Sequence, residues 1–517
     1  MDTLAKLYDI LIMNRLRLWC DVDKSQAGAM PKRSCLEQIM TLRLLCDYAK
    51  YMKVKLYIVF IDYSKAYDRV PRNKLVQHLK SLGCGKVMLI AIRNMYRCTR
   101  NILKAATVEA TVGVRQGAPS SCLLFIIYMD KMVKMVKQAI EADGFLGAMH
   151  MLLFMDDTVV IATSRKMCLK KLNTVLEYCK EYGMKLNEDK TKFLVINYHE
   201  NDKQPIVIQG HRINYSTRYM YLGAWFTDSG KMEEVMQLHG AQGQSVVNKF
   251  AVFCATNTDM PFYYKRKVFD AAVASSLLYS TETWFTTNHI NLTRQYSKLV
   301  KCILGVRHNT SINLCYIESG IAPVHHVVAV RRKRFLETKI NMVVRDEPFH
   351  FVYNLCREAN TPGYRFVRKS LEFDLSVNPL DNLIEMTVNK PETATKYVTY
   401  RTELNSQLRV HKVYSERVYV PDYVRLAFTR LRLMSHELKI ETGRWSRVPR
   451  EQRLCQCNLG LIQTECHVLL ECTLSRHLRQ RFVNLNFEDL NLLLNNEEHV
   501  ADLCRYIYEV VKIYKSI

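Results

Sequence analysis

The sequence predicts an α+β fold for about the first 230 residues, followed by a mostly helical and increasingly basic remainder. A short apolar run at 54–61, rich in Val, Ile and aromatics, has the composition of a buried strand that ends at Asp62. Two further apolar runs, 150–154 and 158–163, flank Met155-Asp156-Asp157, which is the pattern of a β-hairpin with acids at its tip. Helical periodicity surrounds these strands, so we expect helices packed on a central hairpin.

The remaining elements follow in order along the chain. Residues 1–48 have helical periodicity on both sides of a loop at 26–34. After the hairpin, Leu169, Leu172, Leu176 and Cys179 mark one face of an amphipathic helix that ends at Gly183. Residues 193–196 have the composition of another strand. No internal repeat or low-complexity linker separates domains, so motif context alone sets the predicted limits: 1–230, 231–345 and 346–517.

The composition favours a nucleic-acid-binding protein. The chain has 517 residues, too many for one compact core, and 48% of them are hydrophobic, enough for folded domains. Its 74 Lys and Arg against 50 Asp and Glu give a net charge of +24, which attracts phosphates. The densest basic run, 331–334, is either a grip on a nucleic-acid backbone or a solvated face.

An anionic membrane surface is the second partner that this charge suggests, but the sequence gives it little support. The longest apolar stretches, such as 122–129, are shorter than the roughly 18–20 residues of a spanning helix. Charged residues interrupt the first 20 positions, unlike in a signal peptide. We therefore expect no membrane partner and an intracellular location, nuclear and/or cytoplasmic. Most of the 17 cysteines are then expected to be buried thiols or metal ligands.

The most informative residues are three acids at predicted strand ends: Asp62, Asp156 and Asp157. Two hard divalent cations about 3.5–4 Å apart need carboxylate oxygens from separate backbone segments, and a strand end beside a hairpin tip can supply them. An Asp-Asp pair alone is more often an ordinary turn. Here both flanks are strongly apolar, so the acids would be partly buried, and bound metal would compensate their charge.

Five segments together resemble the motifs of non-LTR (LINE-type) retrotransposon reverse transcriptases, which are RNA-directed DNA polymerases. In the order in which the family has them, they are Val59-Phe60-Ile61-Asp62-Tyr63-Ser64-Lys65-Ala66-Tyr67-Asp68, Arg115-Gln116-Gly117-Ala118-Pro119-Ser120-Ser121, Phe154-Met155-Asp156-Asp157, Leu186-Asn187-Glu188-Asp189-Lys190-Thr191 and Tyr221-Leu222-Gly223. The resemblance implies a right-hand polymerase fold with fingers and palm at 1–230, a helical thumb at 231–345 and a basic, zinc-binding C-terminal region at 346–517. It also implies an RNA template, a DNA primer or target DNA and dNTPs as partners.

The resemblance assigns catalytic roles to four residues. Asp62 and Asp156 would be the principal ligands of two Mg²⁺ ions, with Asp157 beside them. Lys190 would protonate the leaving pyrophosphate; the alternative is that it is a solvated lysine. The reaction would be in-line attack of a primer 3′-hydroxyl on the α-phosphate of a nucleotide.

Four more residues would contact nucleotide or template. Tyr67 would lie under the incoming sugar and exclude a 2′-hydroxyl, or else be an ordinary core aromatic. Gln116 and Gly117 would let the backbone pass close to template and nucleotide, or else form a plain loop. Arg33 would contact the template, because Gln26-Ala27-Gly28 and Arg33-Ser34 are similar to the segment of the fingers that does so in the family.

Near the C-terminus, three thiols and one imidazole have the composition of a tetrahedral zinc site: Cys455, Cys457, His467 and Cys472. One residue separates the first pair, which is tighter than the usual two to four. The alternative is a set of buried cysteines with an incidental histidine. Many non-LTR elements have a similar Cys-Cys-His-Cys group after a lead resembling Gly443-Arg444-Trp445, and such a module suits binding to structured RNA or target DNA.

Two other functions compete with the polymerase. In the family, more fingers residues precede the segment that Tyr8 and Asn14-Arg15-Leu16 match, so the chain could be an N-terminally truncated, catalytically silent nucleic-acid-binding relic. A metal-dependent nuclease also uses clustered acids, but the segments at 115–121 and 186–191 would then have no evident purpose.

Overall fold

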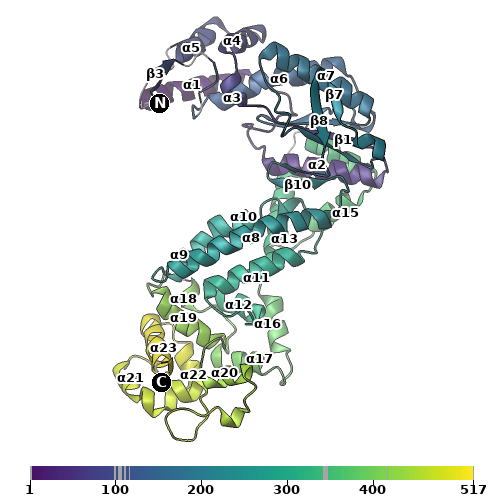
Figure 1. The fold of residues 1–517 in the computed structure, drawn as a ribbon. Coiled ribbons are helices and arrows are strands. Elements are labelled where there is room, and N and C mark those ends of the chain that lie inside the picture. Colours follow the sequence, from purple (N-terminus) through teal and green to yellow (C-terminus); the bar gives the residue numbers. More distant parts are fainter. Residues whose placement is uncertain are drawn as a thin grey trace. The chain divides into compact units, whose positions relative to one another are not determined.

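A computed structural model (Figure 1) describes residues 3–515 except for 98–99, 103–106, 110–111, 116, 342–346 and 416. The chain forms two compact units, each built from discontinuous segments. The first comprises Met1–Val235, Ser280–Thr286 and Arg332–Glu372, and the second comprises Met236–Tyr279, Thr287–Arg331 and Phe373–Ile517. This division by compactness does not test the domain limits at 230 and 345, which stay a prediction.

The first unit contains a sheet with the strand order β4-β5-β1-β6-β8-β7. All its neighbouring strands are antiparallel except β6 and β8. Its strands are β1 (Leu56–Ile61), β4 (Met151–Phe154), β5 (Asp157–Ala162), β6 (Lys192–Ile196), β7 (Ile206–Ile208) and β8 (His211–Tyr215). Two further hairpins are β2 (Arg100–Ile102) with β3 (Thr107–Glu109), and β9 (Arg218–Tyr221) with β10 (Ala224–Thr227). The predicted strand, hairpin and following strand are therefore confirmed.

Both faces of the central strand β1 are covered, which explains its uninterrupted apolar sequence. Tyr57, Val59 and Ile61 join a core built with α6 (Ser121–Ala139) and α7 (Arg165–Tyr182). On the opposite face, Phe60 stacks on Tyr219 of β9 with ring centroids 4.2 Å apart. Helix α7 ends at Gly183 with φ of 72°, the left-handed cap that the sequence predicts.

Helices make up the rest of the first unit. They are α1 (Thr3–Trp19), α2 (Cys35–Tyr51), α3 (Ala66–Arg69), α4 (Arg72–Ser81), α5 (Lys86–Tyr96), α14 (Pro348–Glu358) and α15 (Pro362–Leu371). Buried Arg332 donates hydrogen bonds to the carbonyl oxygens of Glu282 and Thr281, and its guanidinium lies 4.7 Å from the Phe366 ring centre. For Arg332, both interpretations of the basic run at 331–334 are therefore wrong, because this side chain is internal.

The second unit is helical, as predicted for most of the chain beyond residue 230. Its helices are α9 (Phe262–Val268), α10 (Ser275–Leu277), α11 (Ile290–Leu304), α12 (Ile312–Ser319), α16 (Asp381–Val388), α17 (Thr395–Thr399), α18 (Lys412–Ser415), α19 (Asp422–Arg432), α20 (Lys439–Trp445), α21 (Arg476–Arg481), α22 (Leu490–Leu494) and α23 (Val500–Lys515). Helices α8 (Met232–Thr256) and α13 (Val324–Ile340) contain residues of both units. Within the described part of the chain, no helix combines the length and the apolar character needed to cross a membrane.

Candidate functional site

The Asp-Asp pair occupies the tip of the β4–β5 hairpin. Phe154 pairs with Asp157 across the two strands, so Met155 and Asp156 are the two residues of the turn. Met155 has φ of 61°, the left-handed conformation that tight hairpin turns favour. The turn is thus as short as a hairpin allows, and both carboxylates are held at one edge of the sheet.

The strand register brings the third predicted acid to the same edge. Ile61 of β1 lies opposite Thr158 of β5 in an antiparallel pair. The next residue of β1, Asp62, therefore leaves the sheet beside Asp157, since antiparallel partners run in opposite directions. The structure brings together all three acids that the sequence predicts as a cluster.

Electrostatics at this edge favour a cation. Burial, and after it the charges of Asp156 and Asp62, raise the pKa of Asp157 to about 6. Burial also raises the pKa of Asp156, and the charge of Asp62 adds to that rise. No ion pair of the described residues joins any of these carboxylates to a Lys or Arg. Hard divalent cations bind such clustered oxygens, so the donor set fits Mg²⁺.

Asn187 and Thr191 hold Asp62 in place. The Asn187 side chain donates from Nδ2 to Asp62 Oδ2 at 2.9 Å, and its backbone N–H donates to the Asp62 carbonyl oxygen at 2.9 Å. The Asp62 N–H donates to Thr191 Oγ1 at 3.2 Å, and Thr191 is fully buried. The segment 186–191 therefore fixes both the backbone and one carboxylate oxygen of Asp62.

Gln26 holds the hairpin tip in a corresponding way. Its side-chain Oε1 accepts from the N–H of Met155 at 2.9 Å and from the N–H of Gly28 at 2.7 Å, while Nε2 donates to the Met155 carbonyl at 3.2 Å. Gln26 is 2% exposed. A Cβ on Gly28 would lie 2.4 Å from Met155 N, so only glycine lets the loop approach the turn this closely. This part of the segment predicted to contact template packs against the acidic turn.

Tyr67 lies beside the carboxylates. Its ring stacks on Phe125 of α6 with centroids 4.3 Å apart and planes 10° apart, and its hydroxyl lies 3.9 Å from Cys122 Sγ. Burial raises the pKa of Tyr67, and the charge of Asp156 contributes to that rise. The ring is therefore packed against α6 within electrostatic range of Asp156, as a residue under an incoming sugar would need to be.

Arg33 lies in a different environment from the one that template contact would require. Its side chain is 5% exposed, and its Nε donates to Glu37 at 2.5 Å. Glu347 is its second ionic partner, at 3.5 Å, and the carbonyl of Lys24 accepts from Nη1. A template contact of Arg33 stays a prediction, and in the structure the guanidinium belongs to a buried ion-pair network.

The other predicted contact residues lie at the surface or outside the described part. Gly117 is exposed and has φ of 78°, and a Cβ added to it would meet no atom of the described residues within 4 Å. Lys190 is exposed. Gln116 lies outside the described residues. The structure therefore leaves Gly117 and Lys190 accessible, and their roles stay predictions.

A family comparison agrees with this geometry. Residues 1–226 match the family model described as "Reverse transcriptase (RNA-dependent DNA polymerase)". We refer to residues 1–226 as the reverse transcriptase region, because they are similar to this family. All five motif segments lie in the reverse transcriptase region, and the predicted α+β fold is confirmed for it.

Curated proteins similar to this chain confirm the resemblance to non-LTR elements. The retrovirus-related Pol polyprotein from the type-2 retrotransposable element R2DM of Drosophila melanogaster is 25% identical over 245 residues, covering 45% of this chain and 23% of that protein. The Pol polyprotein from the type-1 retrotransposable element R2 of Nasonia vitripennis is 27% identical over 250 residues, covering 44% of this chain and 24% of that protein. The match spans about a quarter of the length of these relatives.

Solved structures similar to the chain include telomerases. Telomerase from Candida albicans, in complex with a fragment of telomeric RNA, matches 72% of this chain and 57% of its own at 12% identity and a TM-score of 0.34. Apo telomerase from Candida tropicalis matches 78% of this chain and 59% of its own at 14% identity and a TM-score of 0.33. TM-scores this low give no basis for assigning roles to residues of the carboxylate site.

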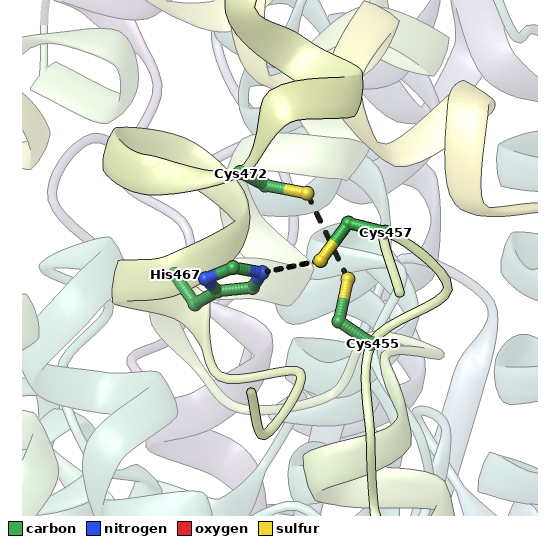
Figure 2. A group of neighbouring side chains, drawn as sticks. All are labelled: Cys455, Cys457, His467 and Cys472. Carbon is green, nitrogen blue, oxygen red and sulfur yellow. Dashed lines mark hydrogen bonds between the residues drawn. The ribbon is translucent and has the colours of Figure 1, made fainter. Parts of the chain in front are cut away.

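Beyond the reverse transcriptase region, the four predicted zinc ligands form a compact cluster (Figure 2). Their ligand atoms all lie within 4.8 Å of one another. Cys455 Sγ is 3.7 Å from Cys472 Sγ, and Cys457 Sγ is 3.4 Å from His467 Nε2. Zinc–sulfur bonds of about 2.3 Å in a tetrahedron give ligand separations of about 3.8 Å, so the arrangement fits zinc closely.

The fold around the Cys/His cluster positions Cys455 and His467. The Cys455 N–H donates to the Leu461 carbonyl at 2.7 Å, which closes the loop that carries both early cysteines. His467 directs Nε2 at the thiols while Nδ1 lies 3.3 Å from Glu471 Oε2, the outer contact typical of zinc-bound histidine. The tight spacing of Cys455 and Cys457 therefore does not prevent a tetrahedral site.

Sequence reasoning missed Gln26 and Asn187 as parts of the site. Both lie inside segments that resemble family motifs, but an amide has no charge and no distinctive spacing. One signal was available: Gly28, two residues after Gln26, indicates a close backbone approach. The sequence does not show which segment Gly28 approaches, because the turn at Met155 is distant in the sequence.

Proposed function

We propose that the chain is an RNA-directed DNA polymerase of a non-LTR retrotransposon, which extends a primer 3′-hydroxyl with dNTPs on an RNA template. The observation that carries the proposal is the convergence of Asp62, Asp156 and Asp157 at one sheet edge of the reverse transcriptase region. Asp62 and Asp156 would hold two Mg²⁺ ions, with Asp157 beside them. When bound, the ions activate the attacking hydroxyl and neutralise charge on the transferred phosphate and the leaving pyrophosphate.

The surrounding residues position these groups. Asn187 orients Asp62 through the bond to Oδ2, and Gln26 fixes the turn that carries Asp156. Both are amides, so they add no charge that would compete with the metal ligands. One carboxylate oxygen of Asp62 and the backbone of the turn are then held in place before metal or substrate arrives.

Four residues would handle the nucleotide and the template. Tyr67, held by Phe125, would exclude a ribose 2′-hydroxyl from the nucleotide site. Lys190 would donate a proton to the leaving pyrophosphate from its exposed position. Gln116 and Gly117 would let the backbone pass close to template and nucleotide.

The C-terminal region would bind nucleic acid through a zinc-stabilised module. Cys455, Cys457, His467 and Cys472 would hold one Zn²⁺, and its partner would be structured RNA or target DNA. The ion would contribute stability here instead of chemistry, because all four positions of a tetrahedral site are filled by the chain.

Primer extension tests the proposal. The purified full chain is incubated with an RNA template annealed to a DNA primer, Mg²⁺ and dNTPs, and extension is resolved on a gel. We expect extension by the wild-type chain and a loss of at least about 1,000-fold in Asp156→Asn, with the fold retained. Asp259→Asn, an exposed acid of the second unit, is the matched control and should extend normally.

Three outcomes would contradict the proposal. Full activity of Asp156→Asn would refute the assignment of the carboxylates. Template–primer binding by the wild-type chain without extension would favour a catalytically silent nucleic-acid-binding protein. Shortening of the primer would favour a nuclease.

A further inference from the structure

The second unit contains a pocket of about 520 Å³ that belongs to neither candidate metal centre. Residues just after α11, helices α19 and α23, and the loop at 435–437 line it. This volume lies within the range of pockets that bind small organic ligands, about 300–1,000 Å³. The chemistry of its lining identifies the ligand class.

Positive charge gathers at this pocket from three separate elements. Arg307, Arg430 and Lys512 line it, and Glu437 is the acidic residue of the lining. Arg430 Nε donates to the Gly305 carbonyl at 2.8 Å, and Arg307 Nη2 donates to the His436 carbonyl at 2.5 Å. Neutral carbonyls fix the guanidinium groups without cancelling their charge.

Acids accompany these guanidinium groups. Burial lowers the pKa of Arg307, the charges of Glu437 and Glu441 oppose that shift, and the charge of Arg430 has a smaller lowering effect. An anion bound in the pocket would be attracted by both Arg307 and Arg430. Phosphate suits the site because guanidinium groups bind its oxygens with matched geometry.

Aromatic surface lies beside these charges. Tyr423 is 43% exposed, and its ring packs edge-on against Tyr508 with centroids 5.5 Å apart and planes 71° apart. Both tyrosines line the pocket. The Trp445 ring centre lies 3.1 Å from the guanidinium carbon of Arg307 and steadies it. A planar group can therefore stack on tyrosine while an attached phosphate reaches arginine.

We propose that this pocket binds one unpaired nucleotide of a single-stranded nucleic acid, with the base against Tyr423 and Tyr508 and the phosphate against Arg307, Arg430 and Lys512. Base stacking with basic contacts to the backbone is the usual means of holding single strands without sequence preference. The inference rests on the proposed nucleic-acid role of the C-terminal region and does not require catalysis.

Photo-crosslinking tests the pocket in the full chain. The probe is a single-stranded RNA of about 12 nucleotides with one central 5-iodouridine, compared with the same strand annealed to its complement and with 5-iodouridine monophosphate. Crosslinked peptides are mapped by mass spectrometry. We expect the single strand to label Tyr423 or Tyr508, and the duplex to label them at least fivefold less, because its bases are stacked and paired.

The monophosphate separates a strand site from a free-nucleotide site. Labelling of the same tyrosines by the single strand at concentrations at least tenfold lower than by the monophosphate supports a strand site. If both probes label the tyrosines at equal concentrations, the proposed strand site is overturned and the pocket is a site for free nucleotides. If neither tyrosine is labelled when the chain is saturated by the strand, the pocket is not a nucleotide-binding site.

Variants provide matched controls. Tyr423→Ala should lower labelling of Tyr508 about tenfold, since stacking on one ring contributes roughly 1–3 kcal/mol, whereas Tyr423→Phe should retain it. Tyr419→Ala removes a 71% exposed tyrosine outside the lining and should have no effect. Lys512→Glu should weaken labelling at low salt more than Lys298→Glu, which makes the same charge change outside the lining. Unchanged labelling of Tyr508 in Tyr423→Ala would overturn the proposal.

This experiment separates failure of the pocket from failure of the polymerase. Labelling needs no extension, so a chain without polymerase activity can still label Tyr423 or Tyr508. Conversely, a chain that extends primers without labelling these residues would overturn only the pocket. Thermal denaturation of each variant shows whether a lost label reflects lost folding.

Discussion

The carboxylate cluster at Asp156 and the thiol cluster at Cys472 hold their ligands by opposite means. At the hairpin tip, three acids share a partly exposed edge, and burial with mutual repulsion raises the pKa values of two of them. At the Cys/His cluster, Cys455, His467 and Cys472 are buried, and the four ligand atoms of the cluster lie within 4.8 Å of one another. The difference indicates what each proposed ion would do: a cation would relieve the repulsion in the first cluster, while zinc would complete a closed centre in the second.

The largest expected effect is on the closed centre. Cys472→Ser should abolish binding of one zinc per chain and destabilise the second unit by at least about 4 kcal/mol, because zinc binding and local folding are coupled. Elemental analysis and chemical denaturation measure the two effects. Cys466→Ser is the matched control, since Cys466 lies next to His467 in sequence but outside the cluster. If the two variants retain zinc equally, the centre is not structural.

A moderate effect is expected when the support of Asp62 is removed. Asn187→Ala should reduce the rate of primer extension by about 10–100-fold and raise the Mg²⁺ concentration needed for half-maximal rate, because Asp62 loses the bond at Oδ2. Zinc content should stay unchanged, which separates the two centres.

Asn201→Ala, at an exposed position of the same unit, is the control for Asn187 and should behave like the wild-type chain. A merely structural role for Asn187 would lower the melting temperature and leave the Mg²⁺ dependence unchanged. That result would remove Asn187 from the carboxylate site.

A smaller effect is expected at the nucleotide side of the carboxylate cluster. Tyr67→Val should reduce the preference for dNTPs over rNTPs by about tenfold or more, since the stacked ring no longer crowds the 2′-hydroxyl. Tyr67→Phe keeps the ring and should keep the preference. Single-nucleotide incorporation with each substrate measures the ratio, and equal preference in wild type and Tyr67→Val would show that Tyr67 is an ordinary core aromatic.

The two centres also differ in how much the sequence reveals about them. The Cys/His ligands lie within 18 consecutive residues, 455–472, so local spacing predicted the whole set. The hairpin and the cap at Gly183 were predictable for the same local reason. The proximity of Asp62 to Asp157 depends instead on which strands pair and in which register, which the strand ends suggested but did not determine.

Long-range partners explain what the sequence could not show. Arg33 pairs with Glu37, four residues away on the same segment, but its second partner Glu347 is more than 300 positions distant. Gln26 meets Met155 only because the loop before α2 lies against β4. Burial of such polar side chains depends on tertiary partners, which composition and periodicity do not encode.

The smallest expected effect is a change in melting temperature. It should have opposite signs in variants of the two centres, so it tests their contrast most directly. In metal-free protein, Asp156→Asn should raise the melting temperature of the first unit by on the order of 2 °C, because it removes one of three mutually repelling charges at a partly solvated edge. Differential scanning calorimetry with and without Mg²⁺ measures it. In the wild-type chain Mg²⁺ should raise the melting temperature, and in Asp156→Asn that increase should shrink. If Asp156→Asn lowers the melting temperature of metal-free protein, as loss of Cys472 should in the other unit, then the acids are held by internal bonds and the cation is not what stabilises them.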